Sequence, residues 1–223
     1  MSTWANSLYH FYTHFDPPRP LPNGVEWLFP QQEPRVRRVV KAFLDKYYND
    51  KNERRLMLGI NPGRFGAGVT GVNFTAPRQL SDVLHIEHSF KMQSEISAEF
   101  IYEMIAAYGG AEAFYSRNFI GSVCPLGFVQ GGKNINYYDD KELLQAVEPF
   151  IIQSIEAQLR LPVDRSICAV IGGEKNFKYL QRLNARFAWF EQLQPLPHPR
   201  FIMQYKRREK EQFISQYLQL LQQ

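Results

Sequence analysis

The sequence contains only two cysteines, Cys124 and Cys168, in 223 residues. An iron–sulfur cluster is usually held by four thiolates, so the cysteines of this chain cannot form such a set. Both cysteines lie in apolar or turn contexts, which are typical of reduced thiols. His85 and His88 are three positions apart, but no third metal ligand lies near them in the sequence. We interpret them as surface or packing residues and expect neither a metal nor another cofactor.

Long hydrophobic runs are also missing. No apolar stretch approaches the roughly 20 residues that a membrane span needs. The first 15 residues have neither the charged n-region nor the continuous apolar h-region of a signal peptide. We therefore expect a cytoplasmic protein with no membrane partner. The formal net charge of +4 is compatible with a polyanionic partner but does not require one.

Signals for a nucleotide-triphosphate or dinucleotide site are lacking as well. A P-loop would end in Gly-Lys-Ser/Thr, and a dinucleotide turn would open a helix with its glycine motif. Instead, an apolar run over residues 56–60 ends at Asn61 and breaks into a loop rich in Gly and Pro. The Asn amide can orient a water or a substrate edge, although it has no proton to lose near neutral pH. Phe74, 13 positions after Asn61, offers a ring that can stack on a planar group.

The order of apolar and amphipathic segments predicts an α/β fold. We expect four short apolar strands, at 56–60, 118–123, 167–171 and 190–196. We expect helices at 35–48, 94–108, 140–160, 175–184 and 206–221, preceded by an N-terminal helix and a Pro-rich strap within residues 1–34. Helices of this length can serve as crossovers, which predicts a three-layer αβα sandwich with a central four-stranded parallel sheet. Residues 1–223 are expected to form one domain.

Polar or Gly-rich residues stand where each predicted strand ends. They are Asn61, the segment 122–124, Gly172 and His198. In an open parallel sheet, ligands bind in the crevice at the carboxyl ends of the strands. These residues are therefore expected to meet in one site.

The loop after the first strand resembles a motif of a known family. The residues are Gly59-Ile60-Asn61-Pro62-Gly63, Gly66, Thr70-Gly71-Val72 and Phe74. They are similar to the first motif of the single-strand-selective monofunctional uracil-DNA glycosylases, within the uracil-DNA glycosylase superfamily, and look closest to a bacterial branch. His198-Pro199 matches the second motif, while Cys124-Pro125-Leu126 and Gly131-Gly132-Lys133-Asn134 resemble the central segment. The resemblance runs over about residues 56–205 and implies a uracil-DNA glycosylase-like fold. With only two cysteines, the chain lies outside the superfamily branches that carry an iron–sulfur cluster.

The resemblance assigns the catalytic roles to Asn61 and His198. Asn61 is expected to position the attacking water, where more active branches have Asp, which implies slower turnover. His198 is expected to donate a hydrogen bond to a carbonyl oxygen of the leaving base, and a neutral imidazole can do so. From the residues alone, Asn61 could instead close its own turn, and His198 could cap a strand end beside Pro199.

The same resemblance implies a base-binding group of four residues. Ile60 would offer its backbone amide to the base, Gly63 would leave room beside the sugar or base, and Phe74 would stack on the flipped base. Core packing for Phe74 and a plain turn for Gly63 are the alternatives. Ser122 stands where many members have an Asn that reads uracil, and one rotating hydroxyl reads less strictly than an amide. Xanthine and hypoxanthine therefore become plausible substrates beside uracil.

Candidate DNA contacts lie in the second half of the chain. Gly172 and Gly173 precede a helix, where free amides suit a phosphate, although a tight turn explains them nearly as well. Arg200 and Phe201 follow the second motif, at the place where the family carries a loop that wedges into the duplex. Lys206, Arg207 and Arg208 come next; they can hold phosphates or form the solvated face of a helix.

Together these features predict a monofunctional DNA glycosylase of base excision repair. It would flip a deaminated base from single- or double-stranded DNA and hydrolyse the N-glycosidic bond. No lyase activity is expected, because no lysine occupies a recognised motif position from which to form a Schiff base. A monomer is expected. Two alternatives stay open: a DNA-binding protein of the same fold with weak catalysis, and a hydrolase of free nucleosides or nucleotides.

Overall fold

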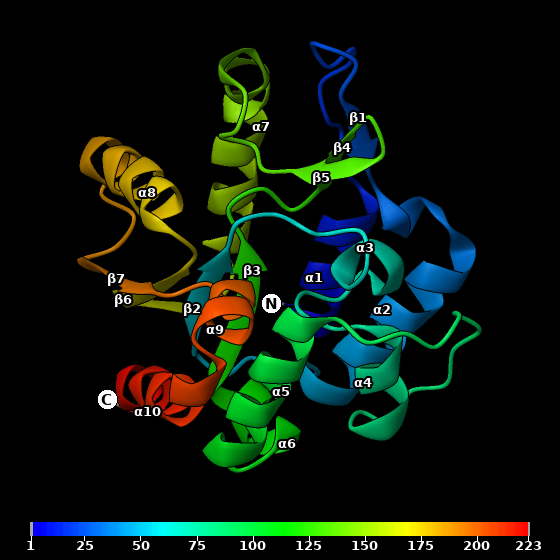
Figure 1. Ribbon diagram of the computed structural model, residues 1–223, viewed down its shortest axis with the longest axis vertical. Coiled ribbons are helices and arrows are strands. Elements are labelled where there is room, and N and C mark those ends of the chain that lie inside the picture. The colour runs from blue at the N-terminus through cyan, green and yellow to red at the C-terminus, as the bar shows by residue number, and fades with distance from the viewer. Residues whose placement is uncertain (1, 223) are drawn as a thin grey trace.

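The computed structural model describes residues 2–222, and a four-stranded sheet lies at its centre (Figure 1). The strands are β2 (Arg54–Gly59), β3 (Asn118–Ser122), β6 (Val163–Ile171) and β7 (Gln192–Leu196), in the order β3-β2-β6-β7. All neighbouring pairs are parallel, so every connection crosses over the sheet. The predicted α/β class and four-stranded parallel sheet are confirmed. Of the predicted single domain, residues 1 and 223 lie outside the described residues.

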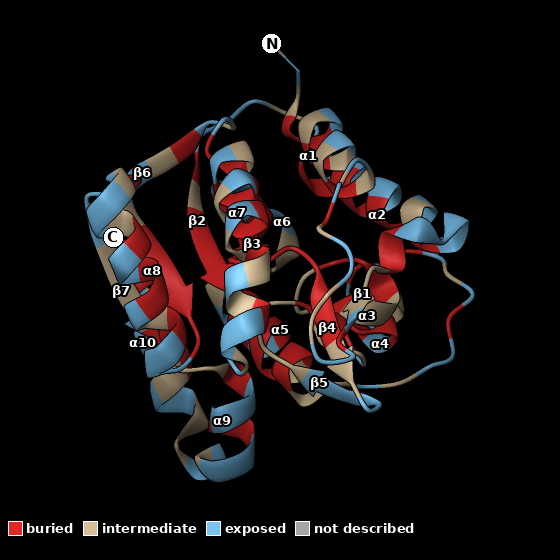
Figure 2. Ribbon diagram, turned by 90° about the horizontal axis from the view of Figure 1, so that it is seen from above, coloured by how far each residue is buried: buried red, intermediate tan, exposed pale blue. Residues whose placement is uncertain are grey.

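Helices cover both faces of this sheet, as Figure 1 shows. The longer ones are α1 (Trp4–Thr13), α2 (Pro34–Tyr47), α5 (Ile96–Tyr108), α7 (Lys141–Gln158), α8 (Glu174–Phe187) and α10 (Lys210–Leu221). Helices α7 and α8 lie on one face, and α5 and α10 on the other. Strands β2 and β3 are almost entirely buried, whereas the edge strand β7 is largely exposed or intermediate, and Figure 2 shows helices whose outer faces are exposed. Within residues 2–222, no helix combines the length and apolar character that crossing a bilayer requires.

Helix α7 shows how the apolar pattern sets the packing. The side chain of Asp140 caps its first turn by accepting a hydrogen bond from the Leu143 N–H (2.8 Å). Val147, Ile151 and Ile155 recur every four residues and are fully buried. Burial of each such side chain stabilises the fold by about 1.5–3 kcal/mol relative to exposure.

Short elements that we did not predict complete the fold. They are α3 (Ala67–Thr70), α4 (Pro77–Asp82), α6 (Ala111–Arg117), α9 (Pro199–Tyr205), η1 (Pro30–Gln32), η2 (Arg207–Glu209), β1 (Glu26–Leu28), β4 (Gly127–Gln130) and β5 (Lys133–Ile135). The three strands form a second, antiparallel sheet in the order β1-β4-β5. Gly131 and Gly132 join β4 to β5 with φ of 54° and 73°, the two positive angles that a tight hairpin requires. This β4–β5 hairpin lies beside the carboxyl end of β2.

Three predicted boundaries were wrong in ways that affect the site. The helix expected from residue 94 begins at Ile96, because Glu95 is the residue that caps it. The segment after His198, expected to be a wedge loop, is helix α9, with Pro199 at its first position, where the missing N–H costs nothing. The last helix begins at Lys210, since the 3₁₀ turn η2 precedes it. Helix α3 itself has only four residues. It is flanked by Gly66 and by Gly71, which caps its C-terminus with φ of 74°.

Candidate active site

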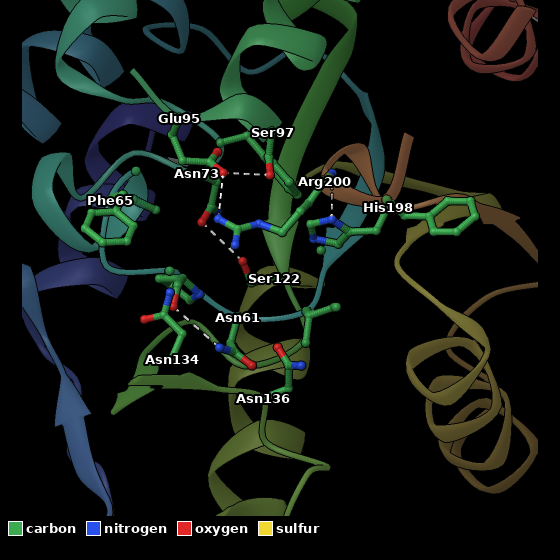
Figure 3. A pocket seen from close by; sticks show the side chains of 18 of the residues that line it. Asn61, Phe65, Asn73, Glu95, Ser97, Ser122, Asn134, Asn136, His198 and Arg200 are labelled. Carbon is green, nitrogen blue, oxygen red and sulfur yellow. Dashed lines mark hydrogen bonds and ion pairs between the residues drawn. The ribbon is translucent and has the colours of Figure 1, made fainter. Parts of the chain in front are cut away.

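A pocket of about 450 Å³ opens at the carboxyl ends of the central strands (Figure 3). This volume lies within the range of small-molecule sites, roughly 300–1,000 Å³. Nine of the residues predicted for the site line it, namely Ile60, Asn61, Gly63, Phe74, Ser122, Gly173, His198, Arg200 and Phe201. Gly172, Lys206, Arg207 and Arg208 are outside its lining. The structure thus brings the two sequence motifs together, although they are far apart in the chain.

The side-chain amide of Asn61 is held in one orientation by the backbone at the end of β5 and just after it. The Tyr137 N–H donates to Asn61 Oδ1 (3.2 Å), and Asn61 Nδ2 donates to the Ile135 carbonyl oxygen (3.3 Å). A backbone donor at one end and a backbone acceptor at the other fix which end is oxygen. Nδ2 also lies 3.4 Å from the Pro62 carbonyl oxygen, a weak contact. One lone pair of Oδ1 remains, which is what an amide needs to hold a water.

His198 is half-buried in the pocket wall and caps helix α9. Its Nδ1 accepts a hydrogen bond from the Arg200 N–H (3.1 Å), so the proton of the neutral ring sits on Nε2. Burial lowers the pKa of His198 to about 4, with Arg200 acting in the same direction and Glu95 opposing it. The ring is therefore neutral at pH 7 and offers Nε2–H as a donor. Capping and donation use different nitrogens, so the capping alternative and the catalytic role are compatible.

Phe74 faces the pocket beside His198. The two ring centroids are 6.0 Å apart, with the planes at 48°. Phe74 has a φ of 50°, in the left-handed region that side chains rarely occupy. Gly59 makes room for the ring, because a Cβ there would lie 2.9 Å from Phe74 Cε2. Phe74 is only half-buried, as a side chain with one face free to stack would be. At Gly63, a Cβ would approach Asn134 Nδ2 to 3.4 Å, which is van der Waals contact.

An ion pair lies across the pocket between α5 and α9. Arg200 Nη2 is 3.1 Å from Glu95 Oε1, and Figure 3 shows the arginine reaching inward. Glu95 also accepts hydrogen bonds from the Ser97 hydroxyl (2.9 Å) and the Ala98 N–H (2.9 Å). Glu95 is the one carboxylate among the described residues that line the pocket. Sequence reasoning missed it, because a helix-capping Glu carries no sign of its partner 105 residues away.

Exposed aromatic side chains surround the pocket opening. Phe201 is 47% exposed and Tyr205 is 73% exposed, with ring centroids 5.7 Å apart on α9. Phe65, 47% exposed, also lines the pocket. Apolar rings left in solvent beside a concave site are typical of a surface that contacts a partner.

The predicted phosphate-binding residues differ in their surroundings. The Gly172 N–H donates to the Leu196 carbonyl oxygen (3.0 Å), so that amide is not free for a phosphate, and our expectation for it was wrong. Gly173 is the N-cap residue of α8 and reaches the pocket. Lys206 pairs with Glu209 (3.0 Å). Arg207 and Arg208 are exposed on η2, and within residues 2–222 neither makes an ion pair.

Asn73 is the main lining residue that sequence analysis passed over. It lies between Val72 and Phe74 of the first motif, so its position was a signal that could have been used. Asn134, on β5, also lines the pocket, and its Oδ1 accepts from the Arg64 N–H (3.1 Å). Both cysteines are buried and unpaired. In the part of the chain that the structure describes, no group of three or more His, Cys, Asp or Glu side chains could hold a metal.

Comparisons with known proteins agree with this geometry. Residues 46–222 match the family model of the Uracil DNA glycosylase superfamily. The whole chain superposes on a crystal structure of wild-type SMUG2 from Pedobacter heparinus with a TM-score of 0.96. The two sequences are 43% identical, and the match covers 100% of this chain and 98% of that one. The chain therefore belongs to the uracil DNA glycosylase superfamily.

Proposed function

We propose that this protein is a monofunctional DNA glycosylase that removes a deaminated base, with uracil as its first substrate and xanthine and hypoxanthine as further ones. The observation that carries the proposal is the state of His198: a neutral ring whose Nδ1 is occupied and whose Nε2–H is free. Asn61, with its fixed amide, lines the same pocket. Membership of the superfamily supports the same conclusion, as does the likeness to a protein named SMUG2.

The reaction follows from these side chains. The flipped base stacks on Phe74, and the bond between the sugar C1′ and the base nitrogen breaks, so its electron pair leaves with the base. Nε2–H of His198 stabilises the charge that develops on the base carbonyl oxygen. A single such donor is worth about 10²- to 10³-fold in rate. A water held by Asn61 adds its oxygen to C1′ and releases its proton to solvent or to the departing base. The products are the free base and an abasic sugar.

The lining of the pocket supports a hydrolytic reaction without a Schiff-base intermediate. Among the described residues that line it, none is a lysine, and no amine is therefore placed to attack C1′. Asn61 cannot act as a general base, so turnover depends on the leaving ability of the base. Bases that are poor leaving groups should be released slowly.

The rim of the pocket supports DNA as the substrate. Phe201 is the side chain we propose for filling the gap that a flipped base leaves in the stack, because it is exposed and projects from α9 beside the pocket. Arg207 and Arg208 follow on η2 and can contact the phosphate backbone. Gly173, at the start of α8, can approach a phosphate closely.

A panel of oligonucleotides, each with one uracil, xanthine or hypoxanthine, tests the proposal. The protein is expected to release the base, and the strand should break only after alkali. His198→Ala and Asn61→Ala should lose most of the activity, while His10→Ala, an exposed histidine on α1, should keep it. DNA binding without release of any base would instead favour a binding protein. Competition by free nucleosides at equal concentration would favour a nucleoside hydrolase.

A further inference from the structure

Asn73 and Ser122 form a hydrogen-bonded pair on the pocket wall, as Figure 3 shows. The Ser122 hydroxyl donates to Asn73 Oδ1 (3.1 Å). Asn73 Nδ2 in turn donates to the Ile120 carbonyl oxygen (2.9 Å) and lies 3.4 Å from the Tyr12 hydroxyl. The carbonyl at Ile120 can only accept, so it fixes Nδ2 on that side and Oδ1 on the side of Ser122.

The donors of this pair are already used. The one hydroxyl proton of Ser122 points at Asn73, and the amide protons of Asn73 point at Ile120 and Tyr12. An amide oxygen has two lone pairs, and the serine donor takes only one of them. A hydroxyl oxygen likewise keeps lone pairs when it donates. The pair therefore presents only hydrogen-bond acceptors to a bound ligand.

The loop that carries Asn73 is firmly held. The Thr70 hydroxyl donates to the Thr75 carbonyl oxygen (2.7 Å), closing the turn around Asn73 and Phe74. Both of these neighbours line the pocket, although successive side chains of an extended chain would point to opposite sides. The φ of 50° at Phe74 is the backbone feature that breaks this alternation. One turn thus delivers both an aromatic face and a polar edge.

On the basis of the proposed function, we propose that Asn73 and Ser122 together select bases with a protonated ring nitrogen. Uracil has such an N–H at N3, and hypoxanthine and xanthine have one at N1. Cytosine and adenine have a bare nitrogen there, so two acceptors would face each other and remain unpaired, which costs about 10- to 100-fold in rate. Many family members carry a uracil-reading Asn at the position of Ser122 on β3. In this chain the side-chain amide of Asn73, from the first motif, would take over that role. One reading residue pair can then serve pyrimidines and purines alike.

The experiment compares bases that differ only at this nitrogen. Single-turnover release of uracil and of N3-methyluracil is measured for the wild type, Asn73→Ala and Ser122→Ala, with Asn6→Ala, an exposed residue of α1, as the control. The wild type and the control should prefer uracil by at least about 10-fold. Asn73→Ala should release uracil about 10- to 100-fold more slowly and show little preference for uracil over N3-methyluracil. The rate of uracil release should fall less in Ser122→Ala, since Asn73 keeps its own lone pair.

Two further measurements distinguish recognition of the base by Asn73 and Ser122 from a purely structural role of these residues. Binding to an oligonucleotide with a tetrahydrofuran abasic analogue involves no base, so Asn73→Ala should match the wild type there. Melting temperature reports folding, and Ser122→Ala provides a second variant if Asn73→Ala unfolds. A preference for uracil that is unchanged in both variants would overturn the inference. A wild type that releases no base at all would instead refute the proposed function.

Discussion

His198 offers the sharpest test, because its two ring nitrogens can be separated by mutation. An asparagine can cap a helix through its side-chain oxygen, as Nδ1 of His198 does, but it lacks the ring nitrogen that faces the base. His198→Asn should therefore keep helix α9 and lose the donor, which costs about 10²- to 10³-fold in base release. His198→Ala loses both, with an added stability loss of about 1 kcal/mol for the missing cap.

The pH dependence gives an independent measure of the same residue. The pKa of His198 is depressed from 6.5 to about 4 in the folded protein, so folding favours the neutral ring. The resulting stability is fully present above pH 6.5 and is lost as the pH falls from 6.5 to about 4. That shift corresponds to a loss of about 3 kcal/mol. Base release should meanwhile show no inflection near pH 6.5, because the ring is already neutral.

The assays are single-turnover uracil release between pH 5 and 8 and urea unfolding between pH 4 and 8. His198→Asn should show a flatter dependence of unfolding free energy on pH than the wild type, since position 198 then carries no imidazole. An inflection in uracil release near pH 6.5 that vanishes in His198→Asn would refute the neutral-donor assignment. A wild-type release rate in His198→Asn would refute the catalytic role itself.

Three further predictions concern the stacking ring, the wedge and the phosphates. Gly59→Ala places a methyl about 2.9 Å from Phe74 Cε2 and should displace the ring. Single-turnover uracil release should fall about 10-fold, while binding to DNA with an abasic analogue should not change. An unchanged rate of uracil release would contradict the stacking role of Phe74. Phe201→Ala should lower release from duplex DNA about 10-fold but release from single strands far less, since only a duplex has a stack to fill, and equal losses on both would exclude it as the wedge. Arg207→Gln and Arg208→Gln should each weaken DNA binding and reduce the slope of log affinity against log salt by about 0.7 to 0.9. Arg19→Gln, at an exposed arginine, is the control. An unaltered slope would show that neither arginine contacts the DNA.

Much of the site could be predicted because parallel strands end on one edge of a sheet. Asn61 and His198 are at the ends of β2 and β7, so locating the strands was enough to bring them near each other. Other contributions depend on contacts that local patterns do not encode. Ser122 meets Asn73 across 49 positions of sequence, and Arg200 meets Glu95 across 105.

Short elements were missed for a related reason. Strands β1 and β5 have three residues each, too few for an alternating pattern to be visible. Helix α9 begins at Pro199, directly after its N-cap His198, and we took this pair for the start of a loop although proline is favoured at the first position of a helix. The interpretation of Arg200 and Phe201 as loop residues followed from that error. Their side chains differ in direction because they occupy successive positions of a helix.

The hold on Asn61 has a consequence for how this site can change in evolution. Its amide is clamped by the main chain at Ile135 and Tyr137, and side chains take no part in the clamp. Gly131 and Gly132 are fixed by the positive φ angles of the turn, and Gly127 and Phe128 by close packing. At the other positions of the β4–β5 hairpin, substitutions can accumulate while Asn61 keeps its orientation. Insertion or deletion of a single residue there would shift the register that pairs Val129 with Asn134 and carry both clamp groups out of place. Outside these four positions, the hairpin should tolerate variation in residue type but not in length.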